Sequence, residues 1–364
     1  MLSALLTLAL ALPPGDPVPV RVDLRVELLT LVWRLIGAGE FNQQQSNSPY
    51  ARAMEEWFGP AREHEVCTLA KVLRATRGIG YNAVPDLALH LTPLPELALR
   101  VPLEPWPERL DKRWQGPNVE AFLVALRSFA AETGFLEFVA EHAELYRAAE
   151  ASLGKQVEES RVLEWMQEFF GLEAGTSYVA IPGLLCGPAN YGVSVRLADG
   201  TLELWPVLGC ARWDAAGNPA YDSAIVPTVV HEFTHAFANP VVDAHWPAFE
   251  PALERLYVPV KNQMASQAYS TPRIYAYESL VRACVTRHAL RHGGEEALRK
   301  QVDYEASRGF GYTAGLSALL ARYEAERATY PDLKAFGPEL ARFFAARAEE
   351  LPAPEPAGAA KDGR

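Results

Sequence analysis

Two histidines flank a glutamate in the segment His231–Glu232–Phe233–Thr234–His235. Residues four apart lie on one face of an α-helix, so both imidazoles can reach a single metal ion. Glu232 directly follows the first histidine, where its carboxylate can accept a proton from a metal-bound water. The spacing therefore predicts a helix that carries two zinc ligands, His231 and His235, and a general base, Glu232.

The residues around this motif favour a helix. Pro227 suits its first turn, where the missing N–H costs nothing, and Val229 and Val230 supply apolar packing surface. Asn239–Pro240 is typical of a helix end, because Asn tolerates the left-handed conformation and Pro cannot continue the helix. We therefore expect the helix to end at Asn239.

A catalytic zinc site needs a third protein ligand and one position open to water. Glu278 lies in a largely apolar stretch that Thr271 can cap, Pro272 can begin and Gly293–Gly294 can end as a helix. A carboxylate in such a stretch is costly to bury without a partner, and a metal ion supplies one. The alternative for Glu278 is a solvated side chain or an ion pair with Arg282 one turn later.

Other candidate ligands fit less well. Asp243 and His245 follow His235 closely, but the spacing of the longer motif with a third histidine is absent. His288 and His292 lie four apart near the end of the Glu278 helix, where cationic histidines are common. We expect His245 to support a ligand or to face the substrate.

An HExxH motif followed on a later helix by a glutamate resembles the gluzincin class of zinc metallopeptidases. The strings HEFTHAFANP (residues 231–240) and ESLVRA (residues 278–283) more specifically resemble an uncharacterised bacterial family, domain of unknown function 4932. That similarity extends to residues 26–50 and 190–192, and so covers most of the chain. The resemblance implies a zincin-like fold and a Zn²⁺ site, but no particular substrate.

The chain departs from one gluzincin pattern. Thermolysin-type enzymes carry an Asp one turn after the third ligand, where it orients a zinc histidine, and here that position is Arg282. The acceptor for the imidazole N–H must therefore come from elsewhere. This departure affects a thermolysin-like mechanism more than metal binding.

The expected chemistry is hydrolysis of a peptide or protein substrate by a zinc-activated water, with Glu232 moving the proton. A second electrophile should stabilise the oxyanion. The candidates are Tyr275, which would share the face of Glu278, together with Tyr277, His245 and Arg282. Two alternatives remain: a zinc hydrolase of a non-peptide amide, and an idle zinc-stabilised binding module, which the intact Glu232 disfavours.

The fold class expected is α+β and mostly helical, with a zincin-like core and a small antiparallel sheet or hairpin before the HExxH helix. Asp199–Gly200 between two alternating runs predicts the hairpin turn, and residues 190–194 would form a strand that pairs with an extended peptide or simply belongs to the sheet. The expected regions are a helical N-terminal part (21–170), a catalytic part (171–300) and C-terminal helices (301–350).

The two ends of the chain differ from the rest. Residues 1–12 contain an apolar run that resembles a signal peptide, which predicts export to a periplasm or the outside, and residues 351–364 are rich in Pro and Ala, which predicts a disordered tail. No later stretch is apolar enough for a membrane helix, so stable membrane insertion is not expected.

The net charge and the cysteine positions indicate which partners and cross-links are possible. The net charge of −11 argues against nucleic acid, because binding phosphate needs clustered Lys and Arg. The midpoint of Cys186 and Cys210 falls on the expected turn, which makes a disulfide across the hairpin plausible. Nothing in the sequence indicates the oligomeric state.

Overall fold

The computed structural model describes residues 18–43, 48–116, 118–171 and 175–352. The expected signal peptide and residues 353–364 of the expected tail lie outside this part of the chain. Two compact units are present, residues 1–236 and 237–364. The boundary between the two units falls inside a helix.

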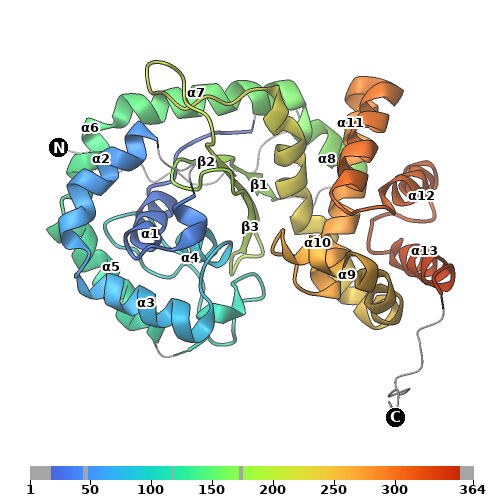
Figure 1. Cartoon of the computed structure of the whole chain (residues 1–364), viewed down its shortest axis with the longest axis horizontal. Helices are drawn as coiled ribbons and strands as arrows, with labels where there is room; N and C mark the ends of the chain where they lie inside the picture. Colours follow the sequence, from blue (N-terminus) through green and yellow to red (C-terminus); the bar gives the residue numbers. More distant parts are fainter. Residues whose placement is uncertain (1–17, 44–47, 117, 172–174, 353–364) are drawn as a thin grey trace, which may run out of the picture. The chain divides into compact units, whose positions relative to one another are not determined.

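The first unit begins with a buried central helix, α1, around which other helices are arranged. Asp23 caps α1, accepting a hydrogen bond from the backbone N–H of Arg25 at 3.0 Å. Every residue of α1 from Arg25 to Leu35 is buried, and α1 lies inside an arc of α2, α3, α5, α6 and α7 (Figure 1). The helices are α1 (Leu24–Leu35), α2 (Pro49–Phe58), α3 (Glu65–Arg77), α4 (Ala83–Leu89), α5 (Asn118–Glu132), α6 (Phe135–Glu141), α7 (Ala143–Ser160) and α8 (Val162–Phe170), with 3-10 turns at Gly39–Phe41, Gly59–Ala61, Lys112–Trp114 and Ser223–Ile225.

A small mixed sheet follows these helices. Its strands are β1 (Ser177–Tyr178), β2 (Ile181–Gly183), β3 (Tyr191–Arg196) and β4 (Leu202–Gly209). The hairpin of β3 and β4 is antiparallel and pairs Tyr191 with Val207, but β1 and β2 both run parallel to β4. The expectation of an antiparallel sheet is therefore wrong for two of the three strand pairs in the described residues.

The reason lies in the burial of β4. All eight of its residues are buried, as is usual for a strand with neighbours on both edges. In a hairpin of two strands alone, Glu203 would face solvent. Its carboxylate is instead 1% exposed and accepts two hydrogen bonds from Arg100, at 2.7 and 2.8 Å. Because Arg100 pairs with Glu203, this charged residue can be buried in a strand that has neighbours on both edges. The sequence therefore contains no sign that β1 and β2 pair with the second edge of β4.

Cys186 and Cys210, between which the sequence made a disulfide plausible, do not form one. Both are buried and free, and Cys186 lies outside the hairpin, five residues before β3 begins. The Cys210 thiol donates to the carbonyl of Arg212 at 3.1 Å. The midpoint argument failed because the paired part of the hairpin ends at Tyr191 and Val207, before either cysteine is reached.

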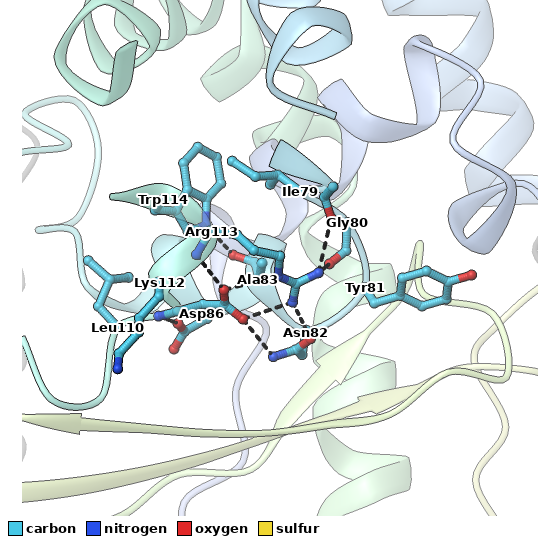
Figure 2. Close-up of polar contacts among 12 residues, drawn as sticks. Ile79, Gly80, Tyr81, Asn82, Ala83, Asp86, Leu110, Lys112, Arg113 and Trp114 are labelled. Carbon is cyan, nitrogen blue, oxygen red and sulfur yellow. Dashed lines mark hydrogen bonds and ion pairs between the residues drawn. The ribbon is translucent and has the colours of Figure 1, made fainter. Parts of the chain in front are cut away.

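The Pro-rich segment after α4 contains no α-helix and is held in place by side-chain hydrogen bonds at its end (Figure 2). The Asp111 N–H donates to Asp86 Oδ2 at 2.6 Å, and the Arg113 guanidinium donates to Asn82 Oδ1 at 2.7 Å. Trp114 Nε1 donates to the carbonyl of Ala83 at 2.7 Å. These bonds attach residues 111–114 to the start of α4.

The second unit is helical. It contains most of α9 (Val226–Tyr257), α10 (Lys261–Ala265), α11 (Pro272–Ser307), α12 (Thr313–Ala325) and α13 (Gly337–Glu349), and a 3-10 turn at Val258–Val260. Thr271 caps α11, with the N–H of Ile274 donating to its Oγ1 at 3.2 Å, as expected. Gly294 has φ 69° and ψ −167°, so α11 bends sharply where the sequence predicted a helix end. Among the described residues no helix is both long and apolar enough to cross a membrane.

Helix α9 does not end at Asn239, contrary to the sequence-based expectation. It continues to Tyr257 with Pro240, Pro247 and Pro251 inside it. Pro240 has no N–H to donate to the carbonyl of Ala236, four residues earlier. The Arg109 guanidinium donates to that carbonyl instead, at 3.4 Å, which satisfies the acceptor that the proline leaves open.

Candidate metal centre

The two motif histidines lie together on the first turns of α9. The Nε2 atoms of His231 and His235 are 3.1 Å apart, and the rings are at 81° to each other. Two nitrogen ligands of one tetrahedral zinc ion, each about 2.05 Å from the metal, would be roughly 3.3 Å apart. The pair therefore has the separation that a shared metal ion requires.

The helix that carries the histidines is anchored by its apolar face. Val229 and Val230 are fully buried, and Phe233 packs against Tyr178 of β1 with ring centroids 6.0 Å apart. Thr234 donates to the carbonyl of Val230 at 2.7 Å. Because alternate turns of α9 are fixed in the core, the two imidazoles are mounted on a rigid support.

Glu232 lies between the two histidines on α9. Although its side chain is charged, the residue is only 8% exposed. Burial raises the pKa of the nearby Tyr191 phenol, and the negative charge of Glu232 contributes to that rise. The Tyr191 hydroxyl has no hydrogen-bond partner among the described residues. The Tyr191 hydroxyl is therefore protonated and can donate a hydrogen bond close to Glu232, the expected base. Sequence reasoning did not assign this role to Tyr191.

Strand β3 packs its backbone directly against the motif turn of α9. A Cβ atom added at Gly192 would lie 2.4 Å from the carbonyl oxygen of Glu232 and 3.2 Å from Cβ of His235. Only glycine allows this approach. The sequence predicted a strand at residues 190–194; within the described residues β3 pairs with β4 alone, so it is an edge strand beside the motif.

Arg109 joins the same strand to the same helix. Its Nη1 donates to Ser194 Oγ at 3.2 Å and to the Ala236 carbonyl at 3.4 Å. Sequence reasoning missed Arg109, because it lies 85 residues before its strand partner and in no motif. The hydrogen-bonded segment that begins at Asp111 (Figure 2) holds the backbone just after Arg109 in place.

We predict that Gly192→Ala destabilises the first unit by about 1–3 kcal/mol and weakens metal binding. The added methyl group meets backbone atoms that cannot rotate away, so β3 or the motif turn must shift. Chemical denaturation and zinc titration of both proteins measure the two effects. The matched control is Gly39→Ala, since a Cβ there meets nothing within 4 Å. Equal stability of the two variants would contradict the prediction.

Glu278 lies on α11 in the second unit and is 6% exposed. The Arg282 guanidinium donates to Glu278 Oε2 at 3.2 Å, so the ion pair considered from the sequence is present. Arg282 also contacts Glu305 Oε2 at 2.5 Å and donates to the Tyr269 hydroxyl at 3.1 Å. Sequence reasoning missed Glu305 because it follows Glu278 by 27 residues, a spacing that predicts no contact.

The other expected electrophiles have clear structural contacts. Tyr275 is 1% exposed and stacks on Phe310, with centroids 5.5 Å apart. His245 Nε2 lies 2.9 Å from the Lys334 carbonyl oxygen. Tyr277 donates its hydroxyl proton to Asp243. Catalytic roles for Tyr275, Tyr277, His245 and Arg282 stay predictions.

Comparison with known proteins identifies a family but no characterised relative. A family described as "Domain of unknown function (DUF4932)" matches residues 18–343. No curated protein and no solved structure matches the chain.

Proposed function

The chain belongs to the DUF4932 family, and we propose that its activity is zinc-dependent hydrolysis with peptides as the substrate class. The observation that carries the proposal is the donor set. The Nε2 atoms of His231 and His235 lie 3.1 Å apart on α9, and we propose that the buried carboxylate of Glu278 on α11 supplies the third ligand. Two imidazoles and one carboxylate are the ligands of a catalytic zinc site with a fourth position left for water.

A zinc ion held by these residues would acidify a water molecule and polarise a substrate carbonyl. Glu232 would accept the water proton and deliver it to the leaving amine. The edge strand β3, next to the motif turn, would align an extended peptide through main-chain hydrogen bonds.

The first twelve residues support export as part of the proposal, since their apolar run has the length and small-residue ending of a secretory signal. A purely structural zinc site would need a fourth protein ligand and no general base. The presence of Glu232 beside the two histidines therefore favours an enzyme over a zinc-stabilised binding module.

We expect the full-length wild type to bind about one zinc per chain, and Glu278→Gln to weaken that binding about 100-fold or more, since it removes a charged ligand. Elemental analysis and competition with a chromophoric chelator measure stoichiometry and affinity. Glu296→Gln is the matched control, because Glu296 is an exposed residue of the same helix, paired with Lys300.

Two results would contradict this prediction. Unchanged affinity in Glu278→Gln would mean that Glu278 serves only as the ion-pair partner of Arg282. A wild type that binds no zinc after reconstitution would overturn the proposed function.

A further inference from the structure

We propose that Arg282 and Glu305 are positioning residues that fix the orientation and the charge of Glu278 for metal binding. This inference rests on the proposed function and assigns a role to two residues that are not among the proposed metal ligands. All three side chains belong to the second unit and are buried, with exposed fractions of 6% for Glu278, 8% for Arg282 and 2% for Glu305.

The guanidinium of Arg282 is held from several directions. Nη2 donates to Glu278 Oε2 at 3.2 Å and to the Tyr269 hydroxyl at 3.1 Å, while Nη1 contacts Glu305 Oε2 at 2.5 Å. The Phe310 ring lies against it, with Cζ 4.3 Å from the ring centroid. A planar guanidinium fixed in this way can hold the Glu278 carboxylate in one rotamer.

Glu305 is positioned for this contact by the break in α11. In a straight helix, 27 residues would separate Glu305 from Glu278 by about 40 Å along the axis. The bend at Gly294 reverses the chain, so the second half of α11 returns Glu305 to Arg282. Gln301 Nε2 donates to the other carboxylate oxygen of Glu305 at 2.6 Å and fixes its plane.

The net charge of Glu278, Arg282 and Glu305 favours binding of a metal cation. A lone arginine next to Glu278 would neutralise the carboxylate and weaken it as a metal ligand. Glu305 makes the shorter contact with Arg282 and so offsets much of the positive charge. The three side chains together carry two negative charges and one positive charge. A cation beside Glu278 would reduce the cost of burying this excess negative charge.

We expect Arg282→Lys to bind zinc about 10- to 100-fold more weakly than the wild type, the usual range for groups that orient a metal ligand. Lysine keeps the charge but loses the fork that contacts Glu278 and Glu305 together. The measurements are chelator competition and the zinc-induced rise in melting temperature of the full chain. A residue that acts only in packing would lower the melting temperature with and without zinc equally, whereas a positioning residue reduces the zinc-induced rise.

Arg287→Lys is the matched control. Arg287 is a half-buried arginine on the same helix, and its Nε donates to Glu324 Oε2 at 2.8 Å. Its replacement should leave zinc affinity within about threefold of the wild type, since Glu324 is not among the candidate metal ligands. Glu305→Gln is the second test variant. It should also weaken zinc binding, because the full charge of Arg282 then acts on Glu278, and it provides the measurement should Arg282→Lys fail to fold.

The outcomes separate this inference from the proposed function. Zinc binding that is lost in Glu278→Gln but unchanged in Arg282→Lys and Glu305→Gln would overturn the positioning role and leave the metal site intact. Absence of zinc from the wild type would overturn both. Weakened binding in the two test variants, with Arg287→Lys unaffected, is the expected result.

Discussion

Replacing Glu232 by Gln is expected to reduce peptide hydrolysis about 10²- to 10⁴-fold while zinc stays bound, because general-base catalysis contributes a factor of this size. Glutamine has nearly the same shape as glutamate but cannot accept the proton of the attacking water. Since Glu232 is not one of the three candidate ligands, the metal-binding group is complete in the variant. The measurement is cleavage of a mixed peptide library followed by mass spectrometry, with zinc content measured on the same samples.

The control for this prediction is Glu250→Gln, which changes an exposed glutamate on the same helix. Its activity should match the wild type. Full activity in Glu232→Gln would exclude Glu232 as the base. Zinc binding without cleavage of any peptide by the wild type would direct the search to non-peptide amides, the alternative that the sequence left open.

The local part of the candidate site could be predicted from sequence because it depends on helical spacing. His231 and His235 are one turn apart in any α-helix, so their convergence to 3.1 Å follows once α9 forms. The cap at Thr271 is also a local signal and was predicted, whereas at Gly293–Gly294 the predicted helix end is a bend after which α11 continues. The antiparallel β3–β4 hairpin, set by the turn at Asp199–Gly200, belongs to the same class.

The contacts that support the site could not be predicted in this way. Arg109 reaches Ser194 across 85 residues, and Glu305 reaches Arg282 because of a bend whose direction no local pattern gives. Helix α9 continues past Pro240 because a distant arginine satisfies the exposed carbonyl of Ala236. In each case a local pattern indicates a polar or charged group that needs a partner, but the partner comes from a distant part of the chain.

Parallel pairing in the sheet was missed for a related reason. In a hairpin of two strands alone, the alternation of Leu202, Glu203 and Leu204 would give one buried and one solvated face, with Glu203 on the solvated face. Arg100 makes burial of Glu203 possible, and with it the pairing of β1 and β2 along the second edge of β4. Contacts between residues far apart in the sequence, such as Arg100 with Glu203 and Arg282 with Glu305, are thus what sequence reasoning missed in both the sheet and the site.

The second prediction with a large expected effect is on the pH dependence of stability, and it concerns Glu27 of α1. Glu27 is fully buried and has no ion-pair partner among the described residues. It accepts hydrogen bonds from the Tyr50 hydroxyl at 3.0 Å and from the Leu184 N–H at 3.1 Å, which attaches the chain after β2 to α1. Burial raises its pKa from 4.5 to about 8, because the hydrogen bonds offset only part of the desolvation.

We expect the wild type to lose stability as the pH rises from about 5 to about 9, and Glu27→Gln to remove much of that loss. A carboxyl group whose pKa is higher in the fold than in the unfolded chain stabilises the fold fully below the unfolded value, 4.5. This contribution disappears as the pH rises through the folded value, and its size is on the order of a few kcal/mol. Glutamine mimics the protonated acid at every pH, with its amide able to donate to Tyr50 and its oxygen able to accept from Leu184.

Urea unfolding at several pH values compares the two proteins, with the exposed Glu56→Gln as control. Parallel stability curves for wild type and Glu27→Gln would show that Glu27 is ionised in the fold, in which case a cation must lie beside it.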